Sequence, residues 1–128
     1  MRTAPRFIVL GSLLALVAVA AGAFGAHVLK LRLRSDLLEI FELAVRYQMY
    51  HSLALLAAGL VERSGGGVWA RRAGYGFLAG ILVFSGSLYA LALTGVRGLG
   101  AVTPLGGVAF LFGWGCLAAA AVKLKGEG

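Results

Sequence analysis

Charged residues are almost absent from four stretches of this chain, and their absence excludes an ordinary soluble fold. Residues 7–29, 73–96 and 98–122 contain no Asp, Glu, Lys or Arg over 23, 24 and 25 residues, and residues 47–61 contain none over 15. A helix of about 20 apolar residues crosses the ~30 Å hydrocarbon layer of a membrane. Only 13% of all residues are charged, against about 25% in soluble domains. The composition therefore predicts a polytopic membrane protein.

Cysteine and the motifs of catalysis are scarce as well. Cys116 is the single cysteine, so the chain cannot form an internal disulfide, and we interpret this residue as a small packing side chain. A GxSxG turn, an HExxH helix, a phosphate-binding loop and a metal-ligand spacing of His, Cys or Glu are all missing. We therefore expect no enzymatic activity, no metal and no cofactor.

Acidic residues are few, at 5 against 12 basic residues, which gives a net charge of +7. The basic residues stand singly or in pairs at the edges of the apolar runs, where they would meet lipid phosphates. They form no basic face with interleaved aromatic rings. We therefore expect the lipid bilayer, and no nucleic acid, as the partner of these charges.

The apolar runs predict an all-α fold, a four-helix transmembrane bundle in one domain that covers residues 1–128. The spans are expected at about residues 6–28, 43–62, 73–94 and 104–122. The beginning of the chain resembles a secretory signal peptide, but its apolar stretch is longer than a typical signal core. We therefore expect the first span to be retained.

The uncharged window of the second span is too short to cross the membrane by itself, so the segment before it must supply part of the span. Residues 37–46 alternate apolar and charged side chains as an amphipathic interfacial helix does. Asp36 and Glu39 have the spacing of a capping box at a helix start. Glu42 and Arg46 stand four apart, in the favourable order for an ion pair on a helix, and this pair would let the span extend outward.

The distribution of basic residues favours an orientation with both termini in the cytoplasm. This arrangement puts 7 basic residues inside and 5 outside. The inside set is Arg2, Arg6, Arg63, Arg71, Arg72, Lys123 and Lys125, and the outside set is Lys30, Arg32, Arg34, Arg46 and Arg97. The bias is slight.

Glycine is abundant, with 20 residues, and many of these lie inside the spans. Membrane helices associate through close contact between small residues, as lipid tails are as apolar as leucine. The same rows of small residues would serve packing within one chain or between chains, and we favour packing within one chain. The candidate helix-packing residues are Gly22, Gly25, Gly76, Gly80, Gly106 and Gly113.

Polar residues inside the spans are the best candidates for a functional site. The alternating direction of the spans would bring them to the same half of the membrane, so we expect one cluster at a common depth. A hydrogen-bonded network that fixes which helix faces meet is the first interpretation. A proton or small-solute route through the histidines is the second, and a haem held by two histidines of the first two spans is the third. The cluster consists of His27, Gln48, His51, Ser85, Ser87, Tyr89 and Thr103.

Five motifs in order resemble a known family. They are Gly22-Ala23-Phe24-Gly25-Ala26-His27, Tyr47-Gln48-Met49-Tyr50-His51, Phe84-Ser85-Gly86-Ser87-Leu88-Tyr89, Thr103-Pro104-Leu105-Gly106-Gly107 and Gly113-Trp114. The chain is similar from its first span to Trp114 to the bacterial membrane family called domain of unknown function 423, which is related to eukaryotic transmembrane protein 256. The resemblance implies a four-span protein of the bacterial inner membrane, and it implies no activity.

Three functions remain open after these observations. The first is a non-enzymatic structural or accessory membrane protein that packs with itself or with a larger membrane assembly. The second is a channel or carrier for protons or small solutes that uses the polar cluster. The haem-binding subunit with His27 and His51 as ligands is a further alternative.

Overall fold

The computed structural model describes residues 3–124, and every regular element in this range is helical. The prediction of an all-helical fold is confirmed. The longer helices are α1 (Thr3–His27), α2 (Ser35–Val61), α3 (Gly67–Gly80), α4 (Gly86–Thr94) and α5 (Thr103–Leu124). Short turns of helix connect them, namely η1 (Leu29–Leu31), η2 (Glu62–Gly66), η3 (Ile81–Ser85) and η4 (Arg97–Ala101).

The number of apolar helices differs from the predicted four. Within residues 3–124, three helical segments are long and apolar enough to cross a membrane, namely Thr3–Leu31, Ser35–Thr94 and Arg97–Leu124. The first and last correspond to two of the predicted spans. The middle segment has 60 residues and contains both other predicted spans, which the kinked η2 turn joins to each other.

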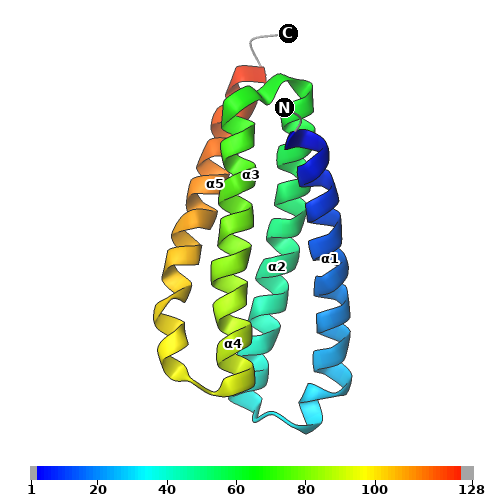
Figure 1. Ribbon diagram of the computed structural model, residues 1–128, viewed down its shortest axis with the longest axis vertical. Coiled ribbons are helices and arrows are strands. Elements are labelled where there is room, and N and C mark those ends of the chain that lie inside the picture. The colour runs from blue at the N-terminus through cyan, green and yellow to red at the C-terminus, as the bar shows by residue number, and fades with distance from the viewer. Residues whose placement is uncertain (1–2, 125–128) are drawn as a thin grey trace.

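Two glycines reverse the chain inside this 60-residue segment. Gly65 has φ 106° and Gly67 has φ 60°, a conformation that glycine adopts far more readily than other residues because it lacks Cβ. The backbone of η2 is therefore not helical throughout. As a result α2 and α3 lie side by side and run in opposite directions (Figure 1).

The helices form an elongated bundle in which α2 and α3 occupy the middle (Figure 1). The α1 helix packs mainly on α2, and α5 packs mainly on α3. The α1 helix begins and α5 ends at the same end of the bundle, beside the η2 turn (Figure 1). The connections η1 and η4 lie together at the opposite end.

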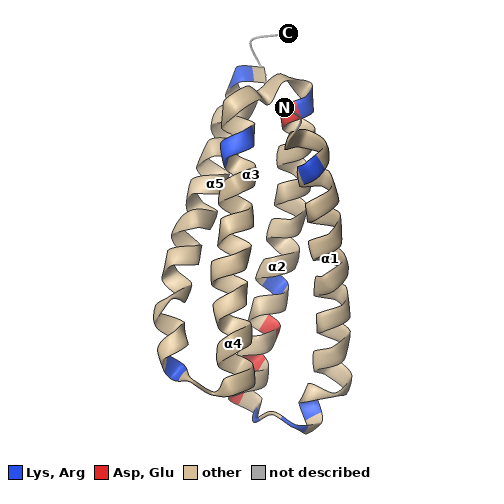
Figure 2. Cartoon of the chain, viewed as in Figure 1, with Lys and Arg blue, Asp and Glu red and all other residues tan. Residues whose placement is uncertain are grey.

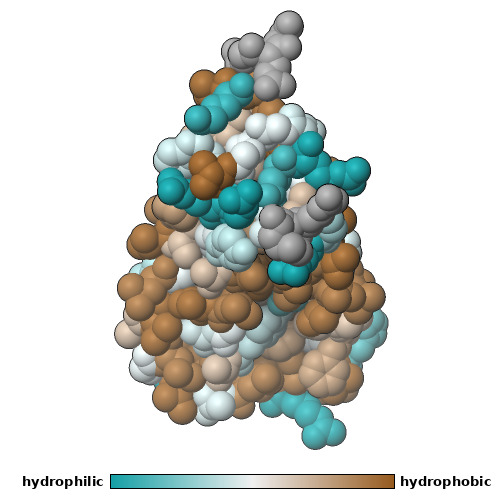
Figure 3. Space-filling view, turned by 45° about the horizontal axis from the view of Figure 1, so that its top comes forward, coloured by the Kyte–Doolittle hydropathy of each residue, from teal (hydrophilic) through white to brown (hydrophobic). Residues whose placement is uncertain are grey.

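Polar and apolar residues divide along the length of the bundle. Lys and Arg gather at its two ends, and the long middle section carries few of them (Figure 2). In the view of Figure 3 the surface below the end that holds the termini is largely hydrophobic. Large apolar side chains such as Leu16, Val19 and Leu111 are exposed on the bundle. A surface of this kind requires an apolar solvent, as the interior of a bilayer provides.

Two apolar clusters fill the space between the helices. The first lies toward the η2 end and is built around Phe7, Leu55 and Phe77, which are almost completely buried. The second lies toward the η1 end and joins Leu29 and Phe41 to Ala92. The first cluster holds α1, α3 and α5 against α2, and the second holds η1 and α4 against α2 at the opposite end.

The segment expected at the membrane interface is part of a continuous helix. The α2 helix runs without interruption from Ser35, so residues 37–46 form no separate element. The predicted amphipathic pattern is present, with Phe41 and Ala44 buried and Glu39 exposed. The predicted capping box does not form, because the residue before α2 is Arg34 and it makes no side-chain cap. Asp36 accepts hydrogen bonds from Arg34 and Arg97 instead.

One turn of π-helix, η3, connects α3 to α4. A π-helical turn accommodates one extra residue in an α-helix. Ser85 lies in this turn, is buried, and donates a hydrogen bond to the backbone carbonyl of Ala44 on α2.

Candidate functional site

Gln48 connects three helices in the interior of the bundle. Its side chain is only 3% exposed. The amide nitrogen Nε2 donates to the backbone carbonyl of Leu14 on α1 at 2.7 Å. The amide oxygen Oε1 accepts from the hydroxyl of Tyr89 on α4, also at 2.7 Å. Both ends of the amide therefore bind helices other than α2.

Two hydroxyl groups join α4 to α5 nearer the η4 end. Ser87 and Thr103 lie with their oxygens 2.6 Å apart, and either hydroxyl can donate. The Ser87 hydroxyl also lies 3.0 Å from the carbonyl of Phe84 in its own segment. Thr103 begins α5, so this contact fixes where α5 starts relative to α4.

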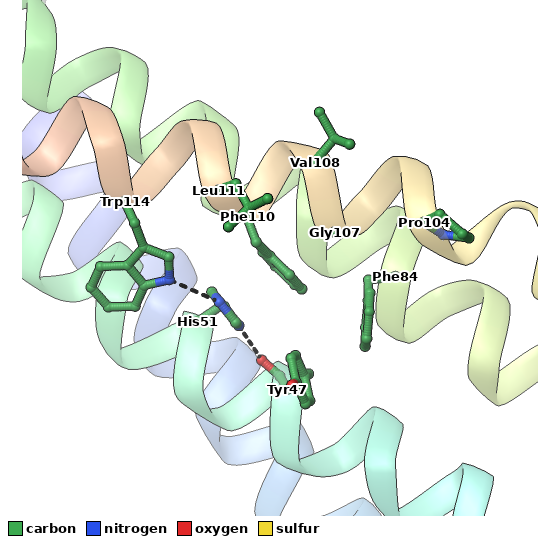
Figure 4. A pocket seen from close by; sticks show the side chains of 9 residues that line it. All are labelled: Tyr47, His51, Phe84, Pro104, Gly107, Val108, Phe110, Leu111 and Trp114. Carbon is green, nitrogen blue, oxygen red and sulfur yellow. Dashed lines mark hydrogen bonds between the residues drawn. The ribbon is translucent and has the colours of Figure 1, made fainter.

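His51 lies between α2 and α5 in a box of aromatic rings. Its Nδ1 is 2.8 Å from the carbonyl of Tyr47 on the preceding turn, and a carbonyl only accepts, so Nδ1 carries the proton. Its Nε2 accepts from the indole Nε1 of Trp114 on α5 at 3.2 Å. Figure 4 shows both contacts. The ring stacks on Phe110 with centroids 3.5 Å apart.

A pocket of about 460 Å³ opens beside His51. Val108 and Leu111 on its rim are exposed on the side of α5, so the pocket faces the surroundings of the bundle. Both ring nitrogens of His51 already have partners within the protein, which makes the wall of the pocket predominantly apolar. The lining residues, labelled in Figure 4, are Tyr47, His51, Phe84, Pro104, Gly107, Val108, Phe110, Leu111 and Trp114.

His27 does not join the other residues of the predicted cluster. It ends α1, its side chain is exposed, and its Nδ1 lies 2.9 Å from the carbonyl of Ala23 on its own helix. His51 lies 16 residues into α2, roughly 24 Å along the axis from the start of that helix at the rise of an α-helix. The two histidines are therefore too far apart to hold one haem between α1 and α2.

The remaining six residues lie in the interior but not at a common depth. Thr103 is at the first turn of α5, whereas Gln48 and His51 lie near the middle of α2. Three separate contacts result, with Ser85 beside the first of them. They are Gln48 with Tyr89, Ser87 with Thr103, and His51 with Trp114.

The interior polar groups leave little hydrogen-bonding capacity unused. Among residues 3–124, no buried side-chain nitrogen or oxygen lacks a hydrogen-bond partner. An unpartnered buried polar group costs about 1–3 kcal/mol. In the same part of the chain, no group of three or more His, Cys, Asp or Glu side chains comes together as a metal site would require.

Five of the six candidate packing glycines lie where a Cβ would press on another helix segment. A Cβ on Gly76 would lie 3.0 Å from Cα of Gly113, and one on Gly113 would lie 2.7 Å from the ring of Phe77. Gly22 differs, since a Cβ there would be in ordinary contact with Val45. The other three, with the group each would meet, are Gly25 (Phe41), Gly80 (Phe110) and Gly106 (Phe84).

Sequence reasoning missed two further glycines and one tryptophan. A Cβ on Gly11 would lie 2.8 Å from the carbonyl oxygen of Ser52, and one on Gly59 would lie 2.9 Å from that of Ala4. Gly11 was detectable, because it continues the small face of Gly22 and Gly25 at helical spacing. Trp114 was detectable as well, since an indole N–H inside an apolar helix usually finds an acceptor.

A fourth polar contact closes the end of the bundle that holds the termini. The Glu62 carboxylate accepts a hydrogen bond from Thr3 and forms an ion pair with Arg71, whose Nε lies 3.2 Å away. The Glu62 side chain is 10% exposed. This contact connects the beginning of α1, the end of α2 and the α3 helix.

An all-helical fold, a hydrophobic surface along the helices and polar contacts between helices in the interior define a small polytopic membrane protein. The chain belongs to the family described as Protein of unknown function (DUF423), whose model matches residues 21–107. The resemblance found in the sequence is thereby confirmed. The matched range contains four of the five motifs, and Gly113-Trp114 lies beyond it.

Bacterial membrane proteins of similar length are close in sequence. A UPF0382 membrane protein of Staphylococcus epidermidis is 50% identical over 120 residues, which cover 94% of this chain and 98% of that protein. The UPF0382 membrane protein YwdK of Bacillus subtilis is 47% identical over 118 residues, which cover 91% and 96%. No solved structure matches the chain.

Proposed function

We propose that this chain is a non-enzymatic structural or accessory protein of the bacterial cytoplasmic membrane that packs with itself or with a larger membrane assembly. The observation that carries the proposal is how Gln48 is used. Both ends of its amide bind α1 and α4, so its polar group joins helices and leaves little capacity for a substrate. The same holds for the two ring nitrogens of His51.

The proposal includes four membrane crossings, with the segment Ser35–Thr94 crossing twice. This segment would be about 90 Å long as one straight helix, three times the thickness of the hydrocarbon layer. Two observations support a double crossing, namely the left-handed backbone at Gly65 and the antiparallel packing of α2 against α3 (Figure 1). Arg63 and Arg71 flank the turn, as expected for groups at a membrane surface.

Both termini would then lie on the same side, and we assign that side to the cytoplasm. The support is the sequence count, which gives 7 basic residues on that side against 5 on the other. The relatives named as bacterial membrane proteins agree with a location in a bacterial membrane.

Transport is the rival function, and a flux measurement separates the two. Purified protein would be reconstituted in liposomes, and the passage of protons and small neutral solutes would be recorded against empty liposomes. The accessory role predicts no flux above that background. Flux that is lost in His51→Ala would overturn it in favour of a channel or carrier.

An absorption spectrum tests the haem alternative directly. The separation of His27 from His51 speaks against a shared haem, so we expect purified protein without a band in the visible range. A native pull-down from membranes would then show whether the chain is alone, bound to copies of itself or bound to another membrane protein. A chain that is strictly alone would contradict the accessory role.

A further inference from the structure

The face of α2 that points away from the bundle carries two charges of opposite sign. Glu42, Arg46, Tyr50 and Leu53 recur at helical spacing and are all exposed, and they are called the α2 stripe here. At 3.6 residues per turn, Arg46 lies roughly 160° around the helix axis from Gln48. Gln48 faces α1 and α4, so the stripe faces the surroundings.

The two charges lie well inside the apolar part of the bundle rather than at its end. Val45, beside Arg46 in the chain, packs on Gly22 of α1. Gly22 is eight residues before Lys30, or about 12 Å along the axis, and the α1 residues between them are uncharged. Figure 2 likewise shows charged positions on α2 above the η1 end. A charge within the apolar layer of a bilayer is unfavourable unless it is paired.

Within residues 3–124, neither Glu42 nor Arg46 is in an ion pair. The ion pairs among residues 3–124 involve Asp36 and Glu62, with Arg34, Arg71 and Arg97. The ion pair expected from sequence between Glu42 and Arg46 is not among them. Both side chains are exposed, so nothing in the packing holds them together.

We propose that a second copy of this chain packs on the α2 stripe, with Glu42 paired to Arg46 of the partner subunit. The inference rests on the self-association included in the proposed function and states where it occurs. Under a two-fold axis along the membrane normal, one patch meets itself and each contact occurs twice. Two Glu–Arg pairs therefore form across the interface.

The charges of the stripe favour a second copy over an unrelated partner because the stripe is complementary to itself. Under the two-fold axis each Glu42 is level with the partner's Glu42, and the partner's Arg46 lies one turn further, about 6 Å along the axis, a distance that the long arginine side chain spans. A pocket of about 280 Å³ between α1 and α2, lined in part by Gly22, Glu42 and Arg46, offers room for a side chain of the second copy. Leu53 continues the contact with apolar surface.

Charge reversal tests the interface when variants are mixed. Glu42→Lys makes both stripe charges positive and Arg46→Glu makes both negative. Each variant alone would place like charges across the interface, which costs several kcal/mol, so we expect association at least about tenfold weaker than that of the wild type. A one-to-one mixture restores complementary pairs and should recover most of the association.

The measurement is energy transfer between labelled copies in liposomes. The labels would be attached at Gly98→Cys, an exposed position, in a Cys116→Ala background. Arg32→Glu is the matched control, because it reverses an exposed charge near the same end of the bundle and should associate like the wild type. If Glu42 and Arg46 attracted each other only within one chain, mixing the two variants would not restore association. A mixture without energy transfer therefore overturns the inference. Single variants that associate like the wild type also overturn it.

The outcomes separate this inference from the proposed function. If wild-type copies show energy transfer but the one-to-one mixture of variants does not, the interface lies elsewhere and the accessory role still stands. A wild type without transfer at any protein-to-lipid ratio removes self-association itself, and the role then requires a different partner.

Cross-linking gives a second test that does not depend on charge reversal. In the same Cys116→Ala background, Leu53→Cys should form a disulfide-linked dimer under mild oxidation. Val108→Cys, on an exposed face of α5, is the control and should remain monomeric. Equal cross-linking of the two variants, or cross-linking of Val108→Cys alone, would contradict an interface on α2.

Discussion

Gln48 is the residue whose contacts tell most about the interior, because one amide group holds α1 and α4 in register with α2. Interhelical hydrogen bonds in membranes contribute about 0.6 kcal/mol on average. These hydrogen bonds matter for this fold because they are directional. The amide of Gln48 fits only one rotation of each neighbouring helix about its axis, whereas apolar contacts accept several.

We predict that Gln48 and Tyr89 stabilise the protein as a pair. Gln48→Leu and Tyr89→Phe should each lower the free energy of unfolding by about 0.5–2 kcal/mol. The double variant should cost less than the sum by about 0.6 kcal/mol or more, because the shared bond is lost only once. Unfolding in mixed detergent micelles measures all three. Strict additivity would show that the two side chains do not interact.

The two histidines should respond differently to removal. His51→Ala deletes a buried ring that stacks on Phe110 and accepts a hydrogen bond from Trp114, so we expect a loss of about 2–4 kcal/mol. His27→Ala removes an exposed side chain bonded to its own helix, and its effect should stay within about 0.5 kcal/mol. Thermal unfolding in detergent compares them. Equal losses would contradict the placement of His27.

The sequence identified the interior polar residues better than it identified their partners. Polar groups inside apolar helices must find partners, which correctly placed Gln48, Ser85 and Tyr89 in the interior. Spacing along one helix does not show which face meets a neighbour, so His27 was grouped with residues that it does not contact. Trp114 escaped notice because a tryptophan in an apolar helix also serves as packing.

At the scale of single helices, the close approach between α3 and α5 depends on glycines, which have no side chain. Gly76 and Gly113 meet almost backbone to backbone. This contact explains why α5 packs on α3 although the helices share few polar contacts. Small residues at such crossings are the usual means of association between membrane helices.

Neighbouring glycines of α5 provide a matched test of this contact. Gly113→Ala would place a methyl group 2.7 Å from the ring of Phe77, and we expect a loss of about 1–3 kcal/mol. Gly115→Ala meets nothing within 4 Å and should be neutral or stabilising by up to about 1 kcal/mol. Unfolding of both variants in detergent makes the comparison. A similar loss in both would indicate that backbone flexibility, not crowding, matters at these positions.

The packing role of glycine was predictable, whereas the continuity of helices was not. Glycines at helical spacing identified five positions where an added Cβ would press on a neighbouring residue. The run Ser64-Gly65-Gly66-Gly67 predicted a flexible turn, and the chain does reverse there, at a kink that joins α2 directly to α3. A glycine-rich turn and a kinked helix have the same composition, and the difference lies in only a few backbone angles.

At the scale of the whole molecule, the placement of both ends of the chain at one end of the bundle makes the number of crossings testable. An even number puts both termini on one side of the membrane, and an odd number separates them. The four crossings proposed here, rather than three, therefore also predict on which side of the membrane each connection between helices lies.

Labelling from outside the cell should distinguish the connections. In a Cys116→Ala background, a membrane-impermeant maleimide should label Gly98→Cys in intact cells. It should label Ser64→Cys only after the membrane is broken, because the η2 turn would face the cytoplasm. A Ser64→Cys protein that is labelled under neither condition would mean that residues 35–94 cross once. Labelling of Ser64→Cys alone in intact cells would reverse the proposed orientation.

The π-helical turn η3 has a consequence for how the family can vary in length. It separates a half of the helix that turns Gly76 and Phe77 toward α5 from a half that turns Tyr89 toward Gln48. Deleting one residue there would restore regular α-helical geometry and leave the two halves facing nearly the same directions, because the wider turn absorbs the extra residue. A relative that is one residue shorter at this turn would therefore keep the same neighbours on both sides of it.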